Sequence, residues 1–169
     1  MVVKGLGQIK NIYFDKIFSF VVKFFSIRMI IGLDASLNLE IKQMDVKKIF
    51  LHSDLEEEVY MVQHKGIKVY GKENFVCKLK KSIYGIKQAP RQWYKKFESV
   101  MGEQGYKKTS SDHCVFVQKF SDNDSIILLL YVDDMLIVGK NTFKIDELKK
   151  ELCKSFCMKD LGHAKQIWA

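Results

Sequence analysis

Residues 126–138 read IILLLYVDDMLIV, and this stretch decides the fold, because two strongly apolar runs enclose a pair of adjacent aspartates. Short runs rich in Ile, Leu and Val are typical of buried strands, so they predict paired strands with Asp133 and Asp134 at a hairpin turn. Two adjacent carboxylates between buried strands repel each other and raise each other's pKa unless a cation lies beside them. The stretch therefore allows two interpretations, a plain turn or a cation site.

The segments on either side of the hairpin predict a protein of mixed helix and sheet. Residues 39–46 (LEIKQMDV) alternate apolar and polar side chains, which predicts a half-buried strand that ends near Asp45. We expect further strands at 56–61, 75–79 and 114–120, and helices at 26–37 with Ser26 as N-cap, from Pro90 to Gly105, and near 142–157. This order favours an α+β fold, an antiparallel sheet with helices packed on one face.

The composition fits one folded domain. The chain has 169 residues, 47% of them hydrophobic, and no Pro-rich or Ser-rich linker divides it, so we expect no internal boundary. Its 28 Lys and Arg exceed its 20 Asp and Glu, and the resulting net charge of +8 favours polyanionic partners such as nucleic acid. No apolar run reaches the ~20 residues of a membrane-spanning helix. The cysteines lack the C-x-x-C spacing of a structural zinc site.

A sheet of this kind can bring Asp45 beside Asp133 and Asp134, because all three acids lie at predicted strand ends. Carboxylate oxygens are the ligands that Mg²⁺ prefers, and two such ions ~3.5–4 Å apart suit in-line phosphoryl transfer. The alternative is that Asp-Asp is a common hairpin dipeptide that needs no metal. On spacing alone, the plain turn is the simpler interpretation.

Three long motifs resemble one known family. LEIKQMDVKKIFLHSDLEEEVYM, KLKKSIYGIKQAPRQWYKKF and LLLYVDDMLIVG closely resemble the reverse transcriptase domain of copia-type LTR retrotransposon polyproteins, and the resemblance covers nearly the whole chain. It implies a polymerase palm-like antiparallel sheet plus partial fingers. Residues 1–38 would be partial fingers and residues 39–169 the palm with an inserted fingers segment, while the thumb and the RNase H region would be absent.

The resemblance also implies a catalytic site. Asp45, Asp133 and Asp134 would be the catalytic acids and, with Val46 beside them, would hold two Mg²⁺ ions, for which Mn²⁺ can substitute. One ion would activate the 3′-hydroxyl of the primer, and the other would neutralise the triphosphate and the leaving pyrophosphate. This interpretation replaces the plain turn at Asp133-Asp134.

Further positions are implied on the nucleotide and nucleic-acid sides. Phe50 would lie beneath the incoming sugar and favour deoxynucleotides, and the lesser alternative is that it is only a core aromatic. Each lysine taken singly is more simply a solvated surface charge than a phosphate ligand, and Trp93 is more simply a core residue than a base-stacking one. The nucleotide-binding residues implied are Lys48 and Ile49 through their backbone N–H groups, Phe50, Tyr84, Gly85, Lys87 and Gln88, and the nucleic-acid-binding residues are Arg91, Lys95 and Lys96.

The chain departs from the family pattern at several positions, where members usually have Pro, Thr, Ala, Gly and two further Pro. The residues found there are Phe20, Lys48, Ile49, Ser53, His64 and His163.

Two functions follow as hypotheses: an RNA-directed DNA polymerase, or a truncated, inactive remnant that still binds nucleic acid. The partners implied are an RNA or DNA template with primer, a deoxynucleoside triphosphate and other Pol segments, with no membrane. The implied location is the cytoplasm, in virus-like particles.

Overall fold

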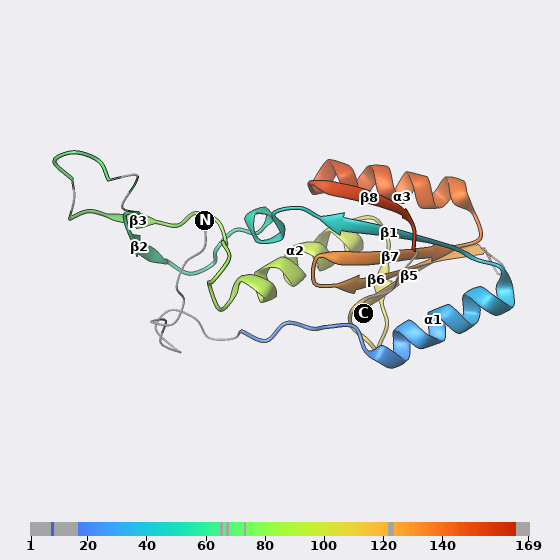
Figure 1. The fold of residues 1–169 in the computed structure, drawn as a ribbon. Helices are drawn as coiled ribbons and strands as arrows, with labels where there is room; N and C mark the ends of the chain where they lie inside the picture. Colours follow the sequence, from blue (N-terminus) through green and yellow to red (C-terminus); the bar gives the residue numbers. More distant parts are fainter. Residues whose placement is uncertain are drawn as a thin grey trace. The chain divides into compact units, whose positions relative to one another are not determined.

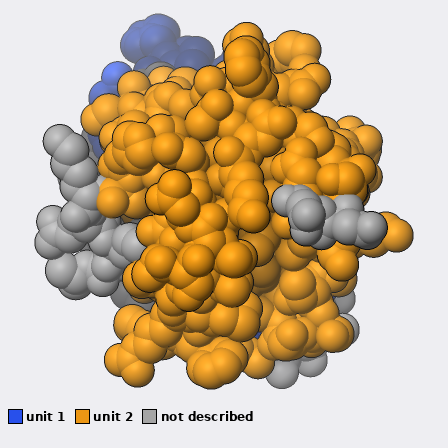
Figure 2. Space-filling view, turned by 90° about the vertical axis from the view of Figure 1, so that its right-hand side faces the viewer, with its two compact units in different colours: residues 1–18, 50–96 blue, residues 19–49, 97–169 orange. Residues whose placement is uncertain are grey.

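The computed structural model describes residues 8, 17–64, 66, 68–72, 74–121 and 124–164. The chain divides into two compact units, the first from residues 1–18 and 50–96 and the second from residues 19–49 and 97–169, coloured separately in Figure 2. We expected no internal boundary. The boundary between the units is not visible in the sequence, because no linker composition marks it. At one place, between residues 96 and 97, the chain passes from the first unit to the second inside a helix.

The second unit contains a six-stranded sheet in the order β4-β5-β6-β7-β1-β8, with every neighbouring pair antiparallel. Figure 1 shows the part from β5 to β8. This sheet confirms the mixed helix and antiparallel sheet class. Its central strands are the apolar runs around the Asp-Asp pair, which are almost fully buried. The strands are β1 (Glu40–Val46), β4 (Lys107–Lys108), β5 (Val115–Ser121), β6 (Asp124–Tyr131), β7 (Asp134–Gly139) and β8 (Met158–His163).

Two helices of this unit lie on opposite faces of the sheet, α1 (Phe24–Leu37) and α3 (Thr142–Ser155). Gly139 faces α3, where an added Cβ atom would lie 3.7 Å from Cδ1 of Ile145. Val138 points to the other face, because neighbouring strand residues alternate, and it lines a cavity together with Leu33 and Leu37 of α1. The expectation that the helices pack on one face is therefore wrong for α1.

The third helix, α2 (Ala89–Glu103), begins one residue before the predicted Pro90 and ends before Gly105, which adopts a left-handed φ of 84°. Its second half belongs to the second unit. There, the fully buried Phe97 packs edge-on against Phe116 at 5.6 Å and stacks on Phe156 at 5.8 Å between ring centroids. These three rings form part of the core beneath the sheet.

The start of α1 differs from the prediction. The N-cap is Lys23, not Ser26, and no side chain of the cap residue bonds to the helix. Instead the buried Asp112 accepts hydrogen bonds from the backbone N–H of Lys23 at 2.8 Å and the hydroxyl of Ser26 at 2.6 Å. The hydrogen-bond acceptor at the start of α1 is thus a carboxylate that lies 86 residues from Ser26 in sequence. Local sequence rules for helix caps do not reveal such a distant partner.

The first unit contains a small sheet and most of a short 3₁₀ helix. β2 (Tyr60–Val62) pairs antiparallel with β3 (Val76–Lys78), shorter than the strands predicted at 56–61 and 75–79, and η2 (Ile49–His52) begins at the boundary with the second unit. Among the described residues, no helix combines the length and apolar character needed to cross a bilayer.

Candidate active site

The sheet register brings the predicted acids together at one end of the β1–β7 pair. Asp45 on β1 lies directly opposite Asp134 on β7, and Asp134 also pairs with Tyr131 on β6. The backbone N–H of Val46 donates a hydrogen bond of 2.8 Å to the carbonyl oxygen of Asp133. This bond ties the turn to the end of β1, so the three acids come from adjoining backbone segments.

The turn is one residue earlier than predicted. Its two loop residues are Val132 and Asp133, while Asp134 already belongs to β7. Val132 has a φ of 55°, and Asp133 is not among the residues with positive φ, a pattern typical of a type II′ hairpin turn. Glycine usually occupies the first position of such a turn, so a β-branched residue there carries strain of about 1–3 kcal/mol.

The three carboxylates influence one another electrostatically. Burial raises the pKa of Asp133 above its usual value, and the negative charges of Asp134 and Asp45 raise it further, against a backbone hydrogen bond that lowers it. All three residues are half-buried. Crowded, half-buried carboxylates are the environment in which a divalent cation relieves repulsion.

Sequence reasoning missed Gln43 at this site. Its side-chain amide donates a hydrogen bond of 3.4 Å from Nε2 to Oδ1 of Asp134. The available signal was its spacing, because Gln43 precedes Asp45 by two residues and so shares its face of β1.

The donor set fits a hard divalent cation, since it consists of carboxylate oxygens. However, among the described residues no group of three or more His, Cys, Asp and Glu side chains is arranged closely enough to hold a metal ion. A metal site at Asp45, Asp133 and Asp134 therefore stays a prediction, which the strand register and the raised pKa of Asp133 support.

Lys48 and Ile49 follow β1 within the same unit. Lys48 is exposed and adopts a left-handed φ of 54° in the turn that leaves the strand. Ile49 is 1% exposed, so its side chain is a core residue rather than a group that projects into solvent. Only their backbone groups remain candidates for the predicted contact with a triphosphate.

Most of the predicted nucleotide-side residues belong to the first unit. Phe50 and Tyr84 contact each other edge-on, with 4.6 Å between ring centroids. Phe50 is 9% exposed, whereas Tyr84 is exposed. Gly85 has a φ of 97°, a conformation that residues with a side chain rarely adopt.

Lys87 and Gln88 are engaged within the first unit. The backbone N–H of Lys87 donates to Oε1 of Gln8 at 2.9 Å, and its ammonium group donates to the Gln8 carbonyl at 3.1 Å. Gln88 is fully buried and accepts a hydrogen bond of 3.1 Å from the Gln8 amide. The Gln88 side chain therefore stabilises the segment at residues 87 and 88 as a buried hydrogen-bond acceptor.

The predicted basic helix face is α2. Lys95 forms an ion pair with Glu56 at 2.7 Å, and this hydrogen bond is the main reason why the pKa of Glu56 is lowered. Lys96 is exposed and Arg91 is half-buried. Trp93 is 2% exposed, which confirms the core interpretation of that residue.

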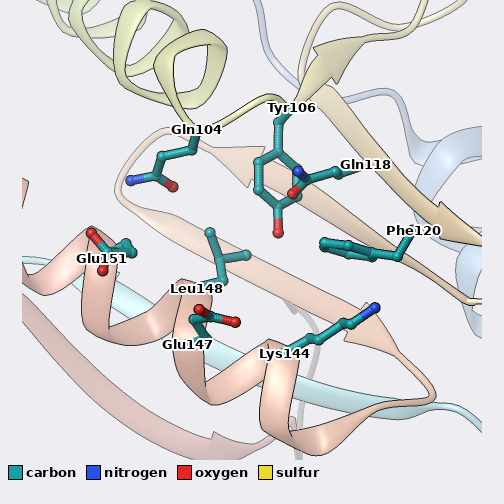
Figure 3. A pocket seen from close by; sticks show the side chains of 8 residues that line it. All are labelled: Gln104, Tyr106, Gln118, Phe120, Lys144, Glu147, Leu148 and Glu151. Carbon is teal, nitrogen blue, oxygen red and sulfur yellow. The ribbon is translucent and has the colours of Figure 1, made fainter.

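A separate cavity of about 320 Å³ lies in the second unit, between the end of α2, β5 and α3 (Figure 3). The ammonium group of Lys144 on its rim is 2.7 Å from the Asp124 carboxylate and 3.7 Å from the Phe120 ring centroid. Tyr106 is buried there, and burial raises its pKa, followed by the nearby charge of Glu147. None of the predicted site residues lines this cavity.

Comparison with known proteins connects this geometry to a family. Residues 1–168 match the family described as reverse transcriptase (RNA-dependent DNA polymerase). The chain is 63% identical over 167 residues, 99% of its length, to the retrovirus-related Pol polyprotein from transposon TNT 1-94 of Nicotiana tabacum. It is 36% identical over 160 residues, 95% of its length, to the corresponding polyprotein from transposon RE2 of Arabidopsis thaliana.

These relatives are much longer than this chain. It spans 13% of the tobacco polyprotein and 11% of the Arabidopsis one. A putative transposon Ty5-1 protein of Saccharomyces cerevisiae is 33% identical over 119 residues, which are 70% of this chain and 38% of that protein. No solved structure matches the chain.

Proposed function

This chain belongs to the reverse transcriptase family, with relatives among copia-type retrotransposon Pol polyproteins, and on that premise we propose that Asp45, Asp133 and Asp134 catalyse RNA-directed DNA synthesis by two-metal nucleotidyl transfer. The observation that carries the proposal is the register that sets Asp45 opposite Asp134, with Asp133 in the adjoining turn. The surrounding sheet would serve as the polymerase palm.

The proposed role of the acids is to present half-buried carboxylates to two Mg²⁺ ions, or to Mn²⁺. When bound, such ions lower the pKa of a hydroxyl nucleophile and neutralise charge on phosphate oxygens. The chain's contribution is orientation. The hydrogen bond from Val46 to the Asp133 carbonyl and the strand pairing of Asp134 restrict where these carboxylates can lie, which reduces the entropy lost when a reactive complex forms.

Nucleotide contacts are proposed for each unit by itself. In the second, the exposed Lys48 turn would offer backbone N–H groups to a triphosphate. In the first, Phe50, which contacts Tyr84 edge-on, would lie beneath the incoming sugar, and Tyr84 and Gly85 would line the nucleotide side. Lys87 and Gln88 would hold that loop in place.

The proposed partners are a template with primer, a deoxynucleoside triphosphate and other segments of a Pol polyprotein. The net charge of +8 supports a polyanionic partner, and Arg91 and Lys96 would contact phosphates. Lys95 would do so only by leaving its ion pair with Glu56. We propose the cytoplasm, in virus-like particles, as the setting.

Primer extension on an RNA template with Mg²⁺ tests the proposal. The 169-residue chain and a version extended at both ends by family-like sequence are compared, each with Asp133→Asn as its inactive reference. We expect synthesis that depends on Asp133 in the extended version and weak synthesis by the shorter chain, because the duplex must be held in position. Synthesis that survives Asp133→Asn contradicts the assignment. If both versions bind an RNA–DNA hybrid and neither synthesises DNA, the result supports an inactive nucleic-acid-binding remnant.

A further inference from the structure

We propose that Gln43 is a positioning residue for Asp134, an outer-shell amide that orients one carboxylate of the catalytic site. The inference rests on the proposed function, because it gives Gln43 a purpose only if Asp134 serves that site. The observation is the hydrogen bond from Nε2 of Gln43 to Oδ1 of Asp134 at 3.4 Å.

Strand register explains why a glutamine can make this contact. Gln43 lies directly opposite Leu136 on β7, so Asp134 is its diagonal neighbour on the same face. Diagonal neighbours on paired strands are about 7–8 Å apart, a distance that long side chains span and short ones do not. Asparagine carries the same amide on a side chain one methylene shorter, so it should not reach Asp134.

The opposite edge of β1 adds a second observation. The pairing of β1 with β8 shifts register between Gln43 and Met44, where β8 carries an extra residue. Gly162, with a φ of 76°, lies opposite Gln43 at this irregularity. Bulges occur beside active sites and bend the strand that carries the extra residue, here β8, while the register between β1 and β7 stays regular from Glu40 to Asp45.

The chemistry of the bond suits orientation more than strong binding. Its length of 3.4 Å exceeds the usual range of about 2.7–3.2 Å, and the amide is uncharged, so the bond restrains the Asp134 carboxylate weakly and does not neutralise it. The bond uses one acceptor direction of Oδ1 and leaves Oδ2 available to a cation. Outer-shell partners of metal-binding carboxylates characteristically contribute about 10–100-fold to metal affinity or activity.

The test measures Mn²⁺ affinity of the 169-residue chain by calorimetry, together with thermal unfolding without metal. Gln43→Met removes the donor at similar length, and Gln43→Asn keeps the amide but loses the reach. The matched controls are Gln118→Met and Gln118→Asn, because Gln118 is also half-buried in the sheet but lies on β5. Asp133→Asn identifies binding at the three acids.

We expect both Gln43 variants to weaken Asp133-dependent Mn²⁺ binding by about 10–100-fold, with an unfolding temperature close to that of the parent. The Gln118 variants should bind as the parent does. Parent affinity in Gln43→Asn or Gln43→Met overturns the positioning role while leaving the catalytic acids in place. If Gln43→Met does not fold, Gln43→Asn decides. Mn²⁺ binding that ignores Asp133→Asn overturns both this inference and the proposed metal site.

Discussion

Replacing Asp133 by asparagine should stabilise the metal-free protein, because the change removes one of three crowded negative charges. The pKa of Asp133 is raised by burial and then by Asp134 and Asp45, so its ionised form is disfavoured in the folded chain. Charge pairs across a sheet are worth about 0.2–1 kcal/mol each. We use this scale for the repulsion of Asp133, in the turn, by the charges of Asp134 and Asp45. The site is half-buried, so solvent screening limits the expected gain to about 0.5–1 kcal/mol.

The assay is thermal unfolding of the parent and Asp133→Asn, with Asp34→Asn on α1 as a control outside the site. A gain of 1 kcal/mol corresponds to an increase of about 2–4 °C in unfolding temperature for a domain of this size. Saturating Mn²⁺ should reverse the order, because a ligand present at 100 times its Kd stabilises the parent by about 2.7 kcal/mol and the variant by less.

The same raised pKa fixes the sign of the pH dependence. Folding raises the pKa of Asp133 above 3.8, so the folded state binds a proton at this carboxylate more tightly than the unfolded state does. The free energy of unfolding therefore falls as pH rises from 3.8 through the raised pKa. Asp133→Asn should remove this part of the pH dependence. A metal-free variant no more stable than the parent, with an unchanged pH profile, would refute the electrostatic coupling.

Three further predictions concern stability and binding. Asp112→Ala should lower the free energy of unfolding by about 2–4 kcal/mol in chemical denaturation, since it leaves the Ser26 hydroxyl and two backbone N–H groups without their acceptor. Hydrogen bonds outweigh burial and lower the Asp112 pKa, so its contribution should fade as pH falls below 3.8 toward that lowered pKa. Val132→Gly should raise the free energy of unfolding by about 1 kcal/mol, because glycine relieves the strain at a φ of 55°; unchanged stability would argue against strain. Binding of an RNA–DNA hybrid, measured by fluorescence anisotropy, should weaken with salt. The logarithm of the binding constant should fall with the logarithm of the salt concentration at a slope of roughly −0.9 per neutralised phosphate, and salt-independent binding would argue against phosphate contacts.

The strongest sequence patterns predicted their elements well. Alternation over residues 39–46 corresponds to β1 (Glu40–Val46), and the apolar runs around the Asp-Asp pair correspond to β6 and β7. The helix from Pro90 to Gly105 corresponds to α2. In each case the hydrophobic period is long and agrees with the burial in the structure, so local sequence and tertiary packing favour the same state.

The elements that were missed depend on distant partners. β8 has the sequence MKDLGH, which shows no apolar alternation, and it is a strand because it pairs with the edge of β1. The N-terminus of α1 is satisfied by Asp112, and Gln43 reaches Asp134 across 91 positions of sequence. No local pattern encodes such contacts, so they become visible only when the strands are in register.

The most direct test of the central claim is paramagnetic line broadening by Mn²⁺ in NMR spectra of the isotopically labelled chain. If Asp45, Asp133 and Asp134 form the metal site, backbone amide signals of Val46 and of the β6–β7 turn should broaden first at low Mn²⁺, and Asp133→Asn should reduce this effect. Excess Mg²⁺ should restore the signals by competition. Broadening that begins at another acidic segment, such as residues 56–58, or that is unaffected by Asp133→Asn, would contradict the claim.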